Sequence, residues 1–491
     1  MYDLSNETYI KDPDPTQMDK EVQAWEGIPK ENGILRDTLL FRRWAKEITT
    51  TIRQAGGNQP VMPGYMFSTL GGGDNYLGNR DGEIESWHNY DKPESTGWTL
   101  QYEDPVCSKR PVLFEEFGTA GWNSEKDYDG TSQYALAAGA AGAMSYEWGV
   151  EWLTRDLDYT AEPLRESLDF APDPRWFTPA MDLAKLWSTR AVGIFPAPSG
   201  FTYGSTYHGT PFPAEAAVAL GRLGRMGKGL GRAERPEQVY VVVPTAFNGA
   251  RVGMDDVTQV IKKLWEEKAV FGIWQEDCLG SLPESARVLI CPKGVSAVSQ
   301  GKLDELRRSG VEVFTGADNG WQRSTQLTRV AVAPGEGINL LVRRTVQGTL
   351  YSLMSSGQMK AVTLKTERGT AVTLGLNDYA LVHESAVGIN WVQGSGAVAV
   401  GGSRLCTIEQ GRAILASDDG LDLMHSKRVR VLVTKPTRIK FAHVINSVAV
   451  LGENRAEPLA TFMPEGADKT AIDVDSELIR YVLRIDRGLN P

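Results

Sequence analysis

The sequence has little of what most local metal and cofactor motifs need. Its 491 residues include only four cysteines and five histidines. The cysteines stand apart without a CxxC pair, which argues against a disulfide scaffold or a zinc cluster and favours a reducing compartment, the cytoplasm. The histidines are too scattered for a local metal motif or a Ser-His-Asp triad: His88, His208, His383, His425 and His443. We therefore expect neither a metal nor a cofactor.

Several classes of partner are also disfavoured. No apolar run approaches the roughly 20 residues of a membrane helix. The net charge of -10 at pH 7 argues against nucleic acid or an anionic membrane as the main partner. The N-terminal residues contain no secretory signal, and a GxGxxG or Walker pattern for nucleotides is missing. A small neutral substrate remains open.

Aromatic residues are plentiful, with 13 Trp and 16 Tyr concentrated in the first 210 positions. Flat aromatic faces are typical of carbohydrate sites, where they stack on sugar rings, but they are equally typical of core packing. Composition alone leaves both interpretations open. The length indicates two to four domains.

The pattern of apolar residues divides the chain into three parts. Residues 1–228 alternate short apolar strands with helices, which predicts a parallel sheet with crossover helices. One such helix is predicted in "ILRDTLLFRRWAKEITTTIRQAGG", where Phe41 and its apolar neighbours have helical spacing and Gly56-Gly57 marks the end. In residues 229–320 a Gly/Arg/Pro linker precedes the continuous apolar run "VYVVVP" (239–244), which predicts a buried strand, and the whole part predicts a small flavodoxin-like α/β layer. Residues 321–491 alternate with period two between turn residues, which predicts one or two β-sandwich modules.

Polar residues end several apolar runs of the first part. Asn6-Glu7 follows "MYDLS", His88 and Tyr90 end "GEIESWHNY", and Glu116 lies in "VLFEEFG". The carboxyl ends of parallel strands converge on one edge, where active sites are built. Two carboxylates at such an edge suit glycosidic bond cleavage, in which one protonates the leaving oxygen and the other stays ionised.

Four stretches in this order resemble the clan of retaining glycoside hydrolases built on a (β/α)8 TIM barrel, which includes family 5 mannanases and cellulases and family 42 β-galactosidases. The stretch "LSNE" resembles the end of the clan's fourth strand, "SWHNY" its sixth, "KRPVLFEEFG" its seventh and "YEW" its eighth. The resemblance lies in residues 1–228. It implies the C-terminal part of a TIM barrel, strands four to eight, as the fold of that part.

The resemblance also implies the two catalytic roles. Glu7 matches the acid/base and Glu116 the nucleophile. Glu115 competes for the second role. Because neighbouring strand residues face opposite sides, only one of the two can point into the site, and the position next to aromatic-Gly favours Glu116.

Four further residues match the clan's substrate-binding positions. By this match Asn6 holds the substrate 2-hydroxyl, Tyr90 hydrogen-bonds the nucleophile, His88 lines the site and Trp148 forms the floor of a sugar subsite. The implied substrate is a β-linked carbohydrate. The residues leave mannoside, galactoside and glucoside open, and also exo and endo action.

If "MYDLSNE" corresponds to the fourth strand, the first three βα units are not in this sequence. Five strands cannot close an eight-stranded barrel. We therefore expect the C-terminal part of a split or truncated glycosidase, completed by a second chain with the first three units. A mis-set start codon or a degraded gene is the alternative. The order of the three parts resembles family 42, in which the middle domain supports oligomer contacts, so a homo-oligomer stays open.

Two other functions stay open at this point. The chain could be a non-catalytic carbohydrate-binding or assembly remnant of a glycoside hydrolase that keeps its aromatic subsites. The flavodoxin-like layer could bind a small ligand at its strand ends, although a structural spacer is the more common use of such a layer.

Overall fold

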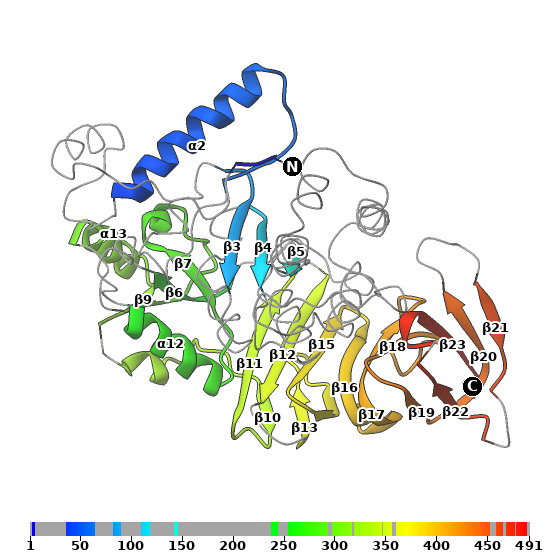
Figure 1. Ribbon diagram of the computed structural model, residues 1–491. Coiled ribbons are helices and arrows are strands. Elements are labelled where there is room, and N and C mark those ends of the chain that lie inside the picture. Colours follow the sequence, from blue (N-terminus) through cyan, green and yellow to red (C-terminus); the bar gives the residue numbers. More distant parts are fainter. Residues whose placement is uncertain are drawn as a thin grey trace, which may run out of the picture.

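The computed structural model describes residues 2–4, 36–63, 82–89, 110–117, 142–145, 237–243, 254–292, 297–316, 319–345, 347–355, 360–451, 458–464, 468–476 and 478–488. These residues form a mixed α/β structure in which strands far outnumber helices. Figure 1 shows helix α2 and strands β3 to β5 beside a compact group of helices and strands, followed by a long series of strands that runs to the C-terminus.

The first described elements form a β-α-β unit. Strand β1 (Tyr2–Asp3) pairs in parallel with β2 (Val61–Met62), and helix α2 (Arg36–Gln54) lies between them in the chain. The helix buries Phe41 and Ala45, against which Leu4 packs. It ends in a glycine cap, since Gly56 has φ +88° and the next amide donates to a carbonyl of the last turn. The helix predicted from apolar spacing is confirmed.

Three more parallel strands follow: β3 (Glu85–Asn89), β4 (Val112–Phe117) and β5 (Gly142–Ser145), in the order β3-β4-β5. They coincide with the apolar runs of the sequence. The residues just before β3 run beside β2, because the amides of Glu83 and Ile84 both donate to the Val61 carbonyl. Strand β2 therefore lies beside the residues that lead into β3, and strands β1 to β5 are neighbours in the order in which they occur in the chain.

A close approach at Gly82 makes this contact feasible. A Cβ at that position would lie 2.3 Å from Cδ of Pro63, so only glycine fits without moving the backbone. Glu83 completes the contact, because its carboxylate accepts hydrogen bonds from the Val61 amide at 3.0 Å and from Arg53 at 2.6 Å.

The second part of the chain forms a four-stranded parallel sheet in the order β7-β6-β8-β9. Tyr240 and Trp274 pack edge to face in its core, with ring centroids 5.2 Å apart. The elements are β6 (Val239–Val243), α12 (Met254–Glu266), β7 (Gly272–Gln275), η3 (Glu276–Ser281), β8 (Val288–Cys291), α13 (Ala297–Arg308) and β9 (Glu312–Thr315), and η4 (Asn319–Arg323) follows them.

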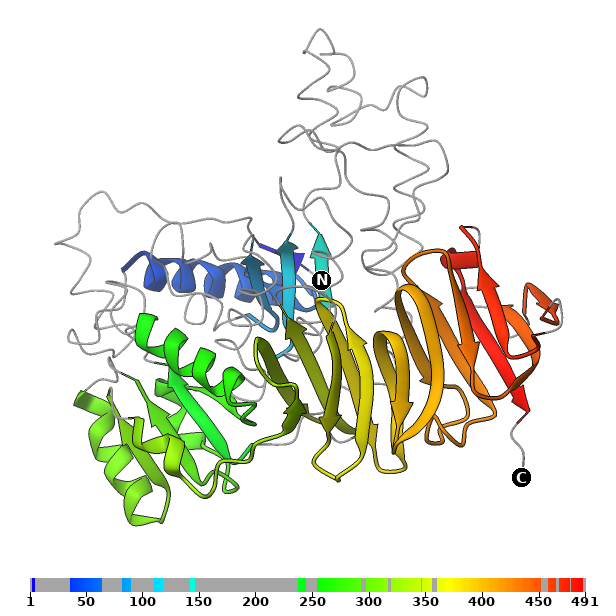
Figure 2. The ribbon, with the colours of Figure 1, turned by 90° about the horizontal axis from the view of Figure 1, so that it is seen from below.

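The rest of the described chain is a network of 14 strands, seen in Figure 2 as one continuous curved row. One hydrophobic cluster runs through it, from Val270 beside the four-stranded sheet to Ile485 near the end. The first strands are β10 (Ala331–Ala333), β11 (Ile338–Arg344), β12 (Gly348–Ser355), β13 (Lys360–Lys365), β14 (Ala371–Leu376), β15 (Tyr379–Ser385) and β16 (Gly388–Val400). The remaining strands are β17 (Ser403–Ser417), β18 (Arg428–Val433), β19 (Thr437–Phe441), β20 (Val444–Leu451), β21 (Ala460–Phe462), β22 (Ala471–Val474) and β23 (Val482–Gly488).

The β character predicted for this part is confirmed, and its only described helix is the short η5 (Leu478–Arg480). The strands are joined by hydrogen bonds in a single branched network, so the division into one or two sandwich modules stays a prediction. None of the described helices is long and apolar enough to span a membrane.

Charged contacts tie the four-stranded sheet to the strand network. Arg344, at the end of β11, lies 2.7 Å from the carboxylate of Glu237, just before β6, and also pairs with Glu367. Glu237 and Arg344 are largely buried, with 9% and 18% of their side chains exposed. Lys268, after α12, donates to the Gly335 carbonyl at 2.8 Å.

Candidate active site at the ends of the parallel strands

Two of the predicted site residues are register partners. His88 on β3 pairs with Glu116 on the adjacent parallel strand β4. Both positions are close to the carboxyl ends of their strands, which finish at Asn89 and Phe117. The structure therefore brings the backbones of these two residues side by side, at the edge where the sequence predicts the site. Figure 1 shows the two strands next to each other.

Strand β4 is bulged next to this position. Against β3, Trp87 pairs with Phe114 while His88 pairs with Glu116, so Glu115 is an extra residue. Against β5, the register again shifts between Phe114 and Phe117. A bulge interrupts the alternation of side chains, and bulges often lie beside active sites, where they re-aim a residue.

The bulge changes the argument for choosing between the two glutamates. Strict alternation would place Glu115 and Glu116 on opposite sides of the strand, but it does not hold across an inserted residue. The choice of Glu116 as the nucleophile stays a prediction, which now depends on the resemblance in sequence and on the His88 register.

The other predicted residues lie outside the described part of the chain. Asn6 and Glu7 come shortly after Leu4, the last described residue beyond β1. Tyr90 directly follows β3, and Trp148 comes three positions after β5 ends at Ser145. Each follows a parallel strand in the chain, and their roles stay predictions.

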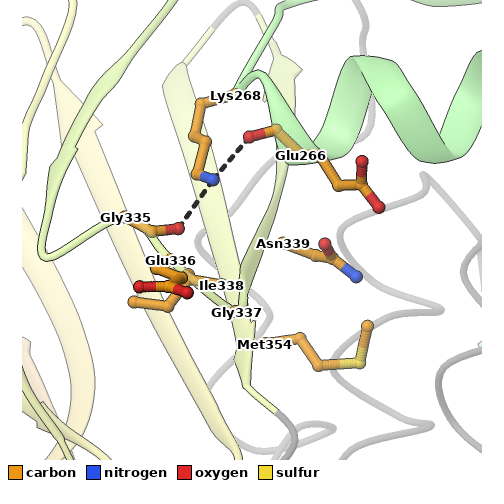
Figure 3. Close-up of a pocket in the computed structure, with 8 residues that line it drawn as sticks. All are labelled: Glu266, Lys268, Gly335, Glu336, Gly337, Ile338, Asn339 and Met354. Atoms are coloured by element: carbon orange, nitrogen blue, oxygen red, sulfur yellow. Dashed lines mark hydrogen bonds between the residues drawn. The ribbon is translucent and has the colours of Figure 1, made fainter.

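A separate pocket, which sequence reasoning missed, lies between the end of α12 and the turn from β10 to β11 (Figure 3). It encloses about 410 Å3 and is lined by Glu266, Lys268, Gly335, Glu336, Gly337, Ile338, Asn339 and Met354. The signal in the sequence that could have indicated it is the glycine-rich turn "PGEG".

Lys268 is held by two hydrogen bonds at this pocket. Its Nζ donates to the carbonyls of Glu266 and Gly335, and Figure 3 shows both hydrogen bonds. Burial is the larger influence on this amine and lowers its pKa, while the charge of Glu266 opposes that shift. The amine thus caps the last turn of α12 and also binds the loop between β10 and β11. Its hydrogen bonds have a structural role.

Within the described ranges, no three His, Cys, Asp or Glu side chains are grouped so that they could hold a metal ion. Cys278, Cys291 and Cys406 are free thiols. Burial raises the pKa of both Cys291 and Cys406 to about 12, so neither thiol is an activated nucleophile near neutral pH.

No family model and no curated protein matches the chain. Among the solved structures that are similar to it are the following three. A catalytic mutant of a GH42 β-galactosidase from G. stearothermophilus is 11% identical, with TM-score 0.37, over 92% of this chain and 67% of that one. The apo exo-carrageenase GH42 from Bacteroides ovatus is 10% identical, with TM-score 0.40, over 95% and 57%. The cold-adapted β-galactosidase from Rahnella sp. R3 is 13% identical, with TM-score 0.32, over 94% and 69%. The chain thus spans between 57% and 69% of the length of these proteins.

Proposed function

We propose that the chain carries catalytic strands of a retaining β-glycosidase. Glu116 acts as the nucleophile and Glu7 as the acid/base. The observation that supports this most directly is the register of His88 with Glu116 on adjacent parallel strands, next to a bulge. To these two residues the sequence match to retaining glycoside hydrolases assigns the nucleophile, Glu116, and a residue that lines the site, His88.

The proposed reaction has two steps. Glu116 attacks the anomeric carbon, Glu7 donates its proton to the leaving glycosidic oxygen, and the sugar becomes an ester of Glu116. Glu7 then removes a proton from water, which attacks the anomeric carbon and releases Glu116 as a carboxylate. Retention requires the two carboxyl groups to lie about 5 to 5.5 Å apart, against roughly 6.5 to 9.5 Å for inversion.

The remaining site residues position the substrate in this proposal. Asn6 binds the 2-hydroxyl, Tyr90 hydrogen-bonds the nucleophile, and Trp148 stacks on the sugar. The substrate is a β-linked mannoside, galactoside or glucoside. Activity depends on the three strands that the match places before Asn6, whichever polypeptide supplies them.

The rest of the molecule has a supporting role in the proposal. The sheet order β7-β6-β8-β9, in which β7, the second strand of this sheet along the chain, lies outside β6, the first, agrees with the start of a flavodoxin-like sheet. We assign this layer and the strand network to support and assembly, as in the domain order of family 42.

A covalent trap tests the assignment of the nucleophile. The chain, alone and together with a polypeptide carrying the first three βα units of such a barrel, is incubated with activated 2-fluoro aryl glycosides of the three sugars. In the preparation that contains those three units, we expect one equivalent of aryl alcohol in a burst and a stable adduct, which peptide mass spectrometry should locate on Glu116.

The matched variants are Glu116→Gln and Glu115→Gln. The first should abolish the burst, while the second should leave the adduct in place. An adduct on Glu115 would contradict the proposed nucleophile while keeping the glycosidase. Sugar binding without a burst in either preparation would favour the non-catalytic remnant instead.

A further inference from the structure

Exposed apolar side chains gather around strand β21, at the end of the molecule farthest from α2 in Figure 1. Leu459 is 45% exposed, Phe462 36% and Met463 61%. The strand pairs with β20 on one side, and no described strand lies on its other side. We call residues 459–463 the β21 edge.

The buried core reaches this edge. Phe462 is the register partner of Val448 on β20, which pairs with Ile485 on β23, which in turn pairs with Val429 on β18. Register partners project from the same face of a sheet. Val448, Ile485 and Val429 are fully buried, so this row of core side chains continues to Phe462 and stops there, partly in solvent.

Such an edge usually carries charges that block further pairing. The stretch 458–464 reads "PLATFMP" and has none. Pro458 and Pro464 lack an amide donor, which restricts pairing to the five residues between them. The edge can therefore accept one short apolar strand.

We propose that this strand is the same segment of a second copy of the chain, paired antiparallel about a two-fold axis through Thr461. That pairing places Ala460 opposite Phe462 and Leu459 opposite Met463. The small Ala460 leaves room for the partner's Phe462, which continues the core row, and the longer side chains meet on the other face. The five residues between the prolines thus complement themselves without a charge among them, and the like-charged Glu457 and Glu465 lie outside the paired stretch.

The interface is short, so the dimer is reversible. Five residues per copy bury less than the standard interface of about 1,600 Å2, which places the contact in the weak class. Association therefore depends on protein concentration and is measurable by sedimentation velocity from about 1 to 100 μM, the range of such affinities.

Charge substitution on the axis tests the proposal. Thr461→Lys puts two ammonium groups opposite each other, and Thr461→Glu does the same with carboxylates. Each variant alone should dimerise at least tenfold more weakly than the unaltered chain. An equimolar mixture of the two should recover the dimer, because Lys then faces Glu, and this recovery also shows that both variants are folded. Val387→Lys, at an exposed turn residue far from β21 in the chain, is the matched control and should dimerise normally.

Three results would overturn the proposal. The unaltered chain could stay monomeric over the whole range of protein concentration. This outcome would count against the proposal even if the β21 edge binds a strand peptide from another protein. Thr461→Lys could dimerise as strongly as the unaltered chain, which would place the interface elsewhere. Finally, the mixed variants could fail to recover the dimer, which would exclude pairing about Thr461.

Discussion

His88 and Glu116 are register partners on the adjacent parallel strands β3 and β4, directly after the residue that bulges β4. A hydrogen-bonding group at the position of His88 favours the ionised form of a neighbouring carboxylate. In the proposed enzyme, His88→Ala should therefore shift the acidic limb of the kcat/KM pH profile to higher pH, by about one unit. Ser86→Ala, two positions earlier on β3, should leave the profile unchanged. Identical profiles for the two variants would argue against a role for His88 at the nucleophile.

The acid/base role of Glu7 has a different kinetic consequence. Glu7→Gln should lower turnover of glycosides with poor leaving groups by about 10² to 10⁴, because their oxygen must be protonated as the bond breaks. Formation of the glycosyl-enzyme from dinitrophenyl glycosides, which need no proton, should change little. Added azide should then accelerate turnover and give a β-glycosyl azide, detected by NMR. Equal losses for both leaving groups would contradict this role.

The ion pair between Arg344 and Glu237 should matter more for stability than an exposed pair. Arg344→Met removes the guanidinium that pairs with the buried Glu237 carboxylate, and the loss of one partner of a buried pair typically costs about 3 kcal/mol. Arg438→Met is the control, since Arg438 is 37% exposed and its partner Asp473 73% exposed, and exposed pairs contribute less than about 1 kcal/mol. Urea unfolding followed by fluorescence compares the two. A smaller shift for Arg344→Met than for the control would refute the expected order.

Two glycine substitutions should change the stability of the protein in opposite directions. Gly82→Ala places a Cβ 2.3 Å from Cδ of the Pro63 ring, so the contact between β2 and the residues before β3 must open, with a cost of about 1 to 3 kcal/mol. Gly301→Ala, inside α13, meets no atom within 4 Å and should stabilise its helix by about 0.5 to 1 kcal/mol. Thermal unfolding of both variants gives the signs directly. A stabilised Gly82→Ala chain would show that the backbone there adjusts freely.

The buried thiols should make stability fall at alkaline pH. Burial raises the pKa of Cys291 and of Cys406 from the ordinary value of 9.0 to about 12. Between these values the unfolded chain loses the thiol protons and the folded chain keeps them, so rising pH favours unfolding by roughly 1.4 kcal/mol per unit for each thiol. Urea unfolding of Cys291→Ser and Cys406→Ser should show a shallower decline above pH 9. Iodoacetamide should label Cys278 in the folded protein before either of them.

Local patterns in the sequence predicted individual elements well. The run Val239–Val243 predicted a buried strand, and all five residues of β6 are buried. The spacing around Phe41 predicted helix α2, and Gly56 predicted its end. These features depend on residues within one or two turns of each other, so the sequence alone determines them.

Features that depend on distant partners were not visible in the sequence. The bulge in β4 arises from the register of β4 against β3 and β5, which come from other parts of the chain. The local sequence Glu115-Glu116 does not indicate it. The period-two pattern predicted that Ile485 lies in a strand, but not that the strand sits between β18 and β20. The Lys268 pocket likewise forms only where α12 meets the turn before β11.

The position of β23 has a consequence for biosynthesis. This strand fills the space between β18 and β20, both of which leave the ribosome earlier. Until Val482–Gly488 emerges, β18 and β20 each keep an open edge that a nascent neighbour on the same messenger could occupy. The strand that closes both edges is thus synthesised after the two strands on either side of it.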